Sequence, residues 1–277
     1  MKGDKVIFSA RSASVGYPGR ILCRDISFDI REGETILLCG ANGSGKSTLL
    51  RSIAEGRTGH GSVETVMVPT GIPKVKGFTL RDFIRTSLYR ESRWNGKVGK
   101  TAADRIDRAL DLLGLGELAS RDISTLSDGE FQKGTIAAAL CRTGEKGGLI
   151  LLDEPTAFLD PENKLTVFRT LGRIAGETGL SFVFASHDLA PALSVCTSVW
   201  ALGRDGVFRS SDALPAGSDA VSNADCSKAD SRGSDADFSK ADGCGSGAGS
   251  RFAGLIETIF SEGSLMNRDL PGGGIFK

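Results

Sequence analysis

The feature that most constrains this chain is a glycine-rich loop placed between an apolar run and a helix-like segment. Residues 40–48 read Gly-Ala-Asn-Gly-Ser-Gly-Lys-Ser-Thr and match the pattern Gly-x4-Gly-Lys-Ser/Thr in full. The apolar run 35–39 precedes the loop, and Leu49, Leu50 and Ile53 follow it at helical spacing. The alternative is a glycine-rich turn with a chance lysine, but this context favours a phosphate-binding loop.

The residue types of the loop indicate how it would hold phosphate. Glycines let the backbone N–H groups turn toward an anion, and the N-terminus of the next helix adds positive partial charge. Lys46 is expected to reach the β- and γ-phosphates, and the Ser47 hydroxyl is expected to ligate magnesium. The candidate nucleotide contacts in the loop are Gly40, Ala41, Asn42, Gly43, Ser44, Gly45, Lys46, Ser47 and Thr48.

The distribution of apolar runs predicts an α/β fold. The runs 35–39, 149–152 and 182–185 are continuous, as in strands of a parallel sheet that is buried on both faces. Short strands are expected near 6–8 and 26–30, separated by Gly and Pro turns, and a closing hairpin is expected over 197–208. Apolar positions at helical spacing fill much of the segment between the first two runs, so we expect a helical insertion over about 76–142.

Two of these runs end in residues that suit catalysis. Asp153 and Glu154 end the run 149–152; Asp153 could hold magnesium through water, and Glu154 could polarise an attacking water. His187 follows the run 182–185. A solvated strand end and a structural histidine are the plain alternatives, but ligands of parallel sheets bind at the carboxyl ends of the strands.

A second phosphate-binding feature is expected at Leu126, Ser127, Asp128, Gly129 and Glu130. Ser127 and Glu130 have the spacing of a capping box, Ser-x-x-Glu, which would begin a helix. The same helix N-terminus could offer its N–H groups and the serine hydroxyl to a γ-phosphate. Both interpretations can hold together.

Over residues 6–210 the sequence resembles the ATP-binding-cassette ATPases. Leu126 to Glu130 is similar to the family signature Leu-Ser-Gly-Gly-Gln, with Asp128 and Glu130 as departures. Asp153-Glu154-Pro155-Thr156 resembles the Walker B end, and Phe158-Leu159-Asp160 resembles the D-loop. His187 falls at the switch histidine, and Tyr17 falls where the family stacks an aromatic ring on adenine, although a turn tyrosine is the alternative.

The resemblance implies a P-loop NTPase (RecA-like) core with an N-terminal antiparallel β region and an inserted helical subdomain. It implies ATP and Mg²⁺ as cofactors, Lys46, Glu154 and His187 as catalytic residues, and Asp160 as a D-loop residue. Thr70 is aligned with the family's magnesium-sensing glutamine, so coupling to a permease is expected to be altered.

The expected partners are a second copy of the chain in a head-to-tail ATP sandwich, membrane permease subunits and, indirectly, a binding protein. The signature together with the segment 153–160 looks most like the importers of ferric siderophores, haem and cobalamin. The implied location is the cytoplasm, peripheral on the inner face of the cell membrane. The segment 74–79 is where the family docks its permease, although its basic residues could equally be a solvated face.

Composition sets the remaining bounds. Lys+Arg and Asp+Glu both number 34, so net charge gives no argument for nucleic-acid binding. No apolar run approaches the roughly 18–20 residues that span a bilayer, the polar N-terminus does not read as a signal peptide, and the cysteines form no Cys-x-x-Cys pair. Ser, Asp, Ala and Gly fill 30 of the 40 positions in 211–250, which predicts a flexible linker between an ATPase domain at 1–210 and a C-terminal helix or tail at 251–277.

Two other functions stay open on sequence alone. A soluble, non-transport cassette ATPase, such as a metal-cluster assembly factor, would keep every nucleotide motif. A nucleotide-regulated binding module with little turnover is the other, because the usual glutamine is replaced at Thr70.

Overall fold

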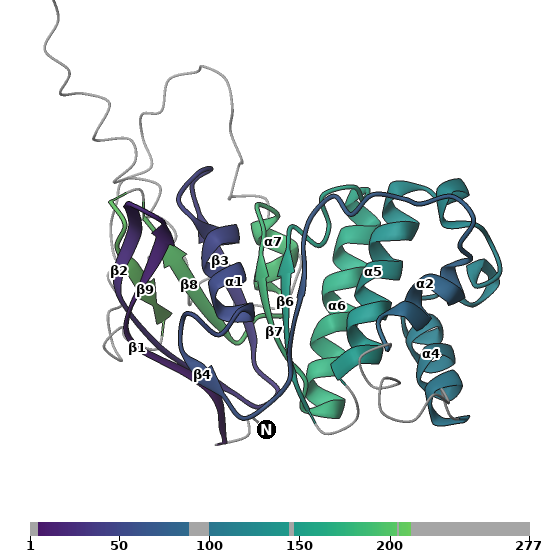
Figure 1. Cartoon of the computed structure of the whole chain (residues 1–277), viewed down its shortest axis with the longest axis horizontal. Helices are drawn as coiled ribbons and strands as arrows, with labels where there is room; N and C mark the ends of the chain where they lie inside the picture. Colours follow the sequence, from purple (N-terminus) through teal and green to yellow (C-terminus); the bar gives the residue numbers. More distant parts are fainter. Residues whose placement is uncertain (1–4, 89–99, 144–146, 204, 212–277) are drawn as a thin grey trace, which may run out of the picture.

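The centre of the fold is a six-stranded sheet (Figure 1), and a hydrophobic cluster lies on each of its faces. The computed structural model describes residues 5–88, 100–143, 147–203 and 205–211. The sheet has the order β5-β6-β7-β3-β8-β9, parallel except for the last strand. Its strands are β3 (Thr35–Gly40), β5 (Thr65–Val68), β6 (Leu149–Asp153), β7 (Ser181–Ala185), β8 (Ser198–Leu202) and β9 (Phe208–Ser210). The three apolar runs are therefore parallel strands, as predicted, and β8 and β9 form the expected closing hairpin.

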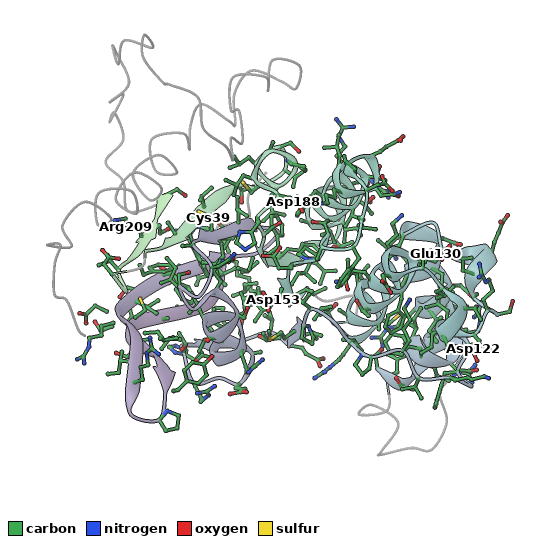
Figure 2. The ribbon with its side chains drawn as sticks, turned by 90° about the horizontal axis from the view of Figure 1, so that it is seen from above. Cys39, Asp122, Glu130, Asp153, Asp188 and Arg209 are labelled. Carbon is green, nitrogen blue, oxygen red and sulfur yellow. The ribbon has the colours of Figure 1, made fainter. Side chains whose placement is uncertain are left out.

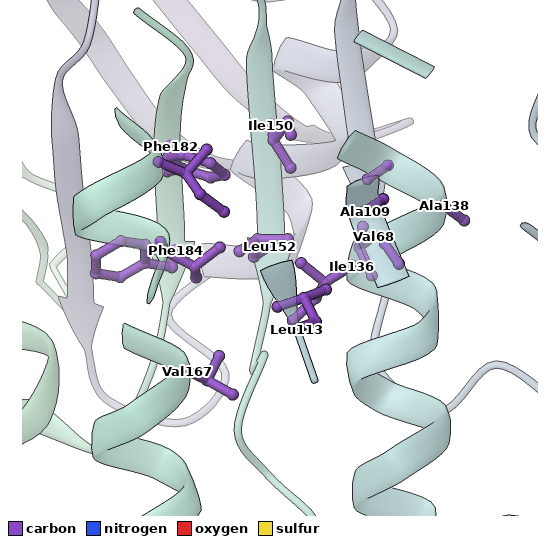
Figure 3. Packing of buried hydrophobic residues seen from close by; sticks show 14 of the residues in the cluster. Val68, Ala109, Leu113, Ile136, Ala138, Ile150, Leu152, Val167, Phe182 and Phe184 are labelled. Carbon is purple, nitrogen blue, oxygen red and sulfur yellow. The ribbon is translucent and has the colours of Figure 1, made fainter. Parts of the chain in front are cut away.

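Each central strand is apolar on both faces because each face packs against a different layer. Ile150 and Leu152 of β6 point toward one hydrophobic cluster, and Leu149 and Leu151 point toward the other. Figure 3 shows the first cluster, where Ile150 and Leu152 lie near Ile136 of the neighbouring helix. This alternation with period two is what a strand requires, and it explains why the runs lack the polar positions of a half-buried strand.

The N-terminal region is one long antiparallel hairpin rather than the short strands that the sequence suggested. The strands β1 (Val6–Tyr17) and β2 (Arg20–Arg31) pair along their length, and β4 (His60–Gly61) adds a short third strand to β1. The register of the pair shifts at several points along its length, and Ser12 and Asp25 have positive φ values of 45° and 55°. The short-strand prediction was wrong because these bulges hide the alternation that marks a strand.

The helices cover the two faces of the central sheet unequally. Helix α1 (Lys46–Ala54) contacts both β1 and the central strands, and its buried residues join the cluster on the β1–β2 side. The opposite face is covered by α5 (Asp128–Thr143), α6 (Pro161–Thr178) and the short α7 (Leu189–Leu193). Two further helices pack on α5 and on each other, namely α2 (Leu80–Thr86) and α4 (Lys100–Leu112).

The segment expected to be helical, about 76–142, contains helices α2, α4 and α5 and two short 3₁₀ turns. The turns are Gly116–Leu118 and Ile123–Thr125. The division of the chain at 210 and the assignments for 211–250 and 251–277 remain predictions, since all but residue 211 of those segments lies outside the described residues. Within the described part of the chain, no helix combines the length and the apolar character needed to cross a membrane.

Candidate active site

The glycine-rich loop connects the carboxyl end of β3 to the start of α1, as predicted. Strand β3 ends at Gly40 and α1 begins at Lys46. A Cβ atom on Gly40 would lie 2.4 Å from the backbone oxygen of Leu202, so this strand end has no room for a side chain. Gly45 precedes the helix with φ 107°, a conformation that L-residues rarely adopt. The loop therefore needs glycine at these two points to bring its backbone around to the helix N-terminus.

Lys46 is folded back onto this loop. It is 7% exposed, and its Nζ donates to the backbone oxygens of Gly40 at 2.9 Å and of Ala41 at 3.2 Å. The Ser44 hydroxyl is buried and has no hydrogen-bond partner among the described residues. A buried hydroxyl without a partner among the described residues and an ammonium that donates to two neutral carbonyls both gain from an anion, so these residues fit a phosphate group.

Asp153, Glu154 and His187 meet at the carboxyl ends of β6 and β7. Asp153 is the last residue of β6 and is 9% exposed. Glu154 has φ 49°, and its backbone N–H donates to the Ala185 oxygen at 2.9 Å, which turns the chain across the end of β7. The Glu154 Oε1 and His187 Nε2 atoms are 3.2 Å apart, so the structure brings the predicted base and the predicted switch histidine into direct contact.

Burial sets the acid–base properties of this group. Burial raises the pKa of Glu154, and the His187 charge and backbone N–H oppose that rise. Burial lowers the pKa of Lys46, while the charges of Glu154 and Asp153 raise it. Lys46 and the two carboxylates thus share one electrostatic environment, although Lys46 begins α1 and the carboxylates lie at the end of β6, 107 or more positions later in the sequence. A carboxylate with a raised pKa is a better proton acceptor.

Thr70 lies next to the Walker B strand end. It follows β5, the neighbour of β6, and its Oγ1 donates to the backbone oxygen of Asp153 at 2.5 Å. The hydroxyl is thus engaged with the chain itself. Ser47, by contrast, is exposed in the first turn of α1. Hydroxyl and carboxylate oxygens of this kind are the ligands that Mg²⁺ prefers.

Tyr17 lies against the helix that follows the loop. Tyr17 is the last residue of β1, and 54% of it is exposed. Its hydroxyl oxygen lies 2.9 Å from Thr48 Oγ1. An exposed ring tethered through its hydroxyl to this helix is available for stacking, which remains the prediction for Tyr17.

The N-terminus of α5 carries the expected capping box. The Glu130 backbone N–H donates to Ser127 Oγ at 3.2 Å, and the Ser127 backbone N–H donates to Glu130 Oε2 at 2.7 Å. This hydrogen bond to the Ser127 backbone lowers the pKa of Glu130. Figure 2 shows Glu130 and Asp153 well apart, with Glu130 among the helices. One chain therefore does not bring its signature residues Leu126 to Glu130 to its own phosphate loop.

The signature instead packs on the segment around the D-loop. A Cβ atom on Gly129 would lie 2.5 Å from Leu159 Cδ2, so glycine allows this close approach. Asp160 caps α6 by accepting the Asn163 backbone N–H at 2.9 Å. That hydrogen bond from Asn163 lowers the pKa of Asp160.

Two charged residues at the site, Asp188 and Lys74, make contacts that the sequence does not indicate. Asp188, directly after His187, accepts from Thr156 Oγ1 at 2.8 Å and from Lys164 Nζ at 2.7 Å, which joins the loops after β6 and β7 to α6. Lys74 donates to the Leu126 backbone oxygen at 2.6 Å and is 2.7 Å from Asp128 Oδ1. One interpretation of segment 74–79 was a solvated face of basic residues. The contacts of Lys74 with Leu126 and Asp128 exclude that interpretation for Lys74.

Comparisons with known proteins agree with this geometry. A family model described as ABC transporter matches residues 23–157. A phosphonates import ATP-binding protein of Caulobacter vibrioides is 34% identical over 73% of this chain and 86% of its own length. A probable siderophore transport system ATP-binding protein of Bacillus subtilis is 29% identical over 65% of this chain and 71% of its own. A chain from an inward-facing ABC transporter assigned to the metal-chelate type is 25% identical, with a TM-score of 0.67 over 74% of this chain and 83% of that one.

Proposed function

This chain belongs to the ABC transporter family as an ATP-hydrolysing importer subunit, and we propose that two copies of it form a head-to-tail ATP sandwich that drives import of an iron chelate. The observation that carries the proposal is the capped N-terminus of α5. The N–H groups of its first turn that the capping box leaves free would accept an anion, yet this turn lies away from the phosphate loop of its own chain. A second copy is the partner that would bring it to a triphosphate.

The chemistry within one chain follows from the site at the ends of β3, β6 and β7. The loop N–H groups and Lys46 bind the phosphates, and Tyr17 stacks on the adenine. Glu154 accepts a proton from the attacking water, and His187 at 3.2 Å orients the Glu154 carboxylate. Ser47, Asp153 and Thr70 would hold Mg²⁺, which neutralises charge on the phosphate oxygens when bound.

The signature residues complete the site from the other copy. The first-turn N–H groups of α5 and the Ser127 hydroxyl contact the γ-phosphate, while Asp160 of the D-loop lies near the same junction. After hydrolysis the charge at the junction changes, so the two copies separate.

Transport requires partners outside the chain. We place this subunit on the inner face of the cell membrane, bound to separate permease subunits, with a binding protein delivering the cargo to them. Relatives named for siderophore, iron(3+)-hydroxamate and petrobactin import favour an iron chelate as cargo. Relatives named for zinc and phosphonate import are the competitors to exclude. A soluble assembly ATPase is not favoured, because these relatives are all importers.

A trapped dimer tests the sandwich. The change Glu154→Gln keeps the shape of the side chain but removes the base, so ATP should bind and not be hydrolysed. We expect size-exclusion chromatography with light scattering to show a dimer for this variant in ATP and magnesium and a monomer in ADP. A monomer in both nucleotides would refute the sandwich.

A transport assay tests the cargo separately. Cells carrying the chain and its permease should take up a ferric siderophore labelled with radioactive iron, and the Glu154→Gln change should abolish that uptake. Zinc uptake that depends on Glu154, with no dependence of iron uptake, would contradict the proposed cargo and leave the ATPase assignment intact.

A further inference from the structure

The turn of α5 that is expected to face a triphosphate carries two acidic residues, Asp128 and Glu130. Helix N-termini bind anions through their free N–H groups, but a carboxylate beside them repels the same anion. An acidic phosphate-binding turn therefore needs each of its negative charges to be directed elsewhere or neutralised.

The structure accounts for Glu130 within the turn itself. Its carboxylate accepts the Ser127 backbone N–H at 2.7 Å, so the charge turns back onto the cap. This contact is the ordinary capping box and needs no residue from outside the helix.

Among the described residues, the charged partner of Asp128 is Lys74, which lies outside the helix. The Lys74 Nζ lies 2.7 Å from Asp128 Oδ1, and it also donates to the Leu126 backbone oxygen at 2.6 Å. The Lys74 side chain is 22% exposed and that of Asp128 is 68% exposed. The same ammonium lies 5.9 Å from the centre of the Phe131 ring. One cation thus holds the residues on both sides of Ser127.

Backbone pairing fixes the segment that supplies Lys74. The Gly77 N–H donates to Asp122 Oδ2 at 2.8 Å, and the Ile123 N–H donates to the Phe78 oxygen at 2.9 Å. At the other end, Thr70 is bonded to the Asp153 oxygen. The segment is therefore anchored by hydrogen bonds before Lys74, at Thr70, and after it, at Gly77 and Phe78.

We propose that Lys74 is a positioning residue that neutralises Asp128 and sets the N-terminus of α5 to receive the triphosphate of the second copy. This inference rests on the proposed ATP sandwich. If the inference is correct, ATP-dependent dimerisation needs Lys74 because the signature carries Asp128. Removing the Asp128 charge should then restore the dimerisation that is lost with Lys74.

The experiment is a two-residue cycle in the Glu154→Gln background. The variants are Lys74→Met, Asp128→Asn and the two together, with Lys76→Met as the control, since Lys76 is exposed on the same segment. Methionine keeps an apolar stem against Phe131 while removing the charge. The readout is the ATP concentration that gives half-maximal dimer by light scattering, at about 0.1 M and at about 1 M salt.

We expect Lys74→Met to raise that ATP concentration roughly 4-fold per site at low salt, as for one uncompensated charge about 8 Å from a phosphate at an effective dielectric of about 20 and a screening length of about 10 Å. Adding Asp128→Asn should restore the parent value, although the bond to the Leu126 oxygen stays broken. High salt should shrink the loss. Asp128→Asn alone should lower the ATP requirement, and this variant can be measured even where Lys74→Met fails to fold.

Three results would overturn the inference. Lys74→Met could behave like Lys76→Met, the double variant could be as defective as Lys74→Met at both salt concentrations, or Asp128→Asn could raise the ATP requirement. Failure of the Glu154→Gln parent itself to dimerise in ATP would refute the sandwich and this inference with it. A parent that dimerises without responding to the cycle refutes the inference alone.

Discussion

Replacing Lys46 by alanine tests the phosphate site most sharply. The Lys46 ammonium is buried and bonded to the Gly40 and Ala41 backbone oxygens, at 2.9 and 3.2 Å. Phosphate oxygens would replace those neutral acceptors, and a hydrogen bond to a charged group contributes about 1.5–3 kcal/mol. Alanine should therefore weaken ATP binding about 10- to 150-fold.

Isothermal titration calorimetry with ATP and magnesium measures this change directly. Lys76→Ala is the matched control, since Lys76 is exposed and lies outside the loop, and its affinity should stay at the parent value. Thermal unfolding of both variants checks that the fold is kept. If Lys46→Ala binds ATP within about 3-fold of the parent while remaining folded, the assignment of the loop as the phosphate site is wrong.

Three further changes test separate contacts. Glu154→Gln should raise the melting temperature at pH 7 but not at pH 4. Burial raises the pKa of Glu154 above its ordinary 4.5, so the contribution of Glu154 to the stability of the parent is complete below that value and is lost as pH rises through the raised pKa. Equal melting temperatures of parent and variant at pH 7 would contradict this. Gly40→Ala should lower the melting temperature further than Gly43→Ala, since both have positive φ but only Gly40 would place a Cβ 2.4 Å from a backbone oxygen; equal losses would remove the steric argument. Tyr17→Ala should weaken ATP binding by about 1–3 kcal/mol and Tyr17→Phe should not, since the ring and not the hydroxyl stacks; calorimetry showing equal losses would end the stacking assignment.

The parts of this account that follow from sequence are those governed by neighbours along the chain. The loop at 40–48 needs its glycines and helix start within nine positions, and the capping box needs only Ser127 and Glu130. The buried strands can be recognised as continuous apolar runs because both of their faces are covered. The geometry of a parallel sheet then places the residue after each run at the edge where ligands bind.

The parts that were missed depend on contacts between distant segments. The bulges at Ser12 and Asp25 leave no alternation to read, so the length of the first hairpin was underestimated. Lys74 meets Asp128 across 54 positions, and Asp188 meets Thr156 across 32. A lone charged residue looks the same in a solvated segment and in a fixed ion pair, so only the fold distinguishes the two.

Mixing two inactive variants tests the central claim that each site is built from two copies. Lys46→Ala removes the phosphate loop's cation, and Ser127→Asp keeps a good helix cap while adding a charge that repels phosphate. Each variant alone should show almost no ATPase activity. In a 1:1 mixture, half of the dimers should contain one chain of each variant. In such a dimer one of the two sites combines an intact phosphate loop with an intact signature, so the mixture should regain roughly a quarter of the parent rate. A mixture as inactive as its components, in which light scattering shows that mixed dimers form, would contradict the account.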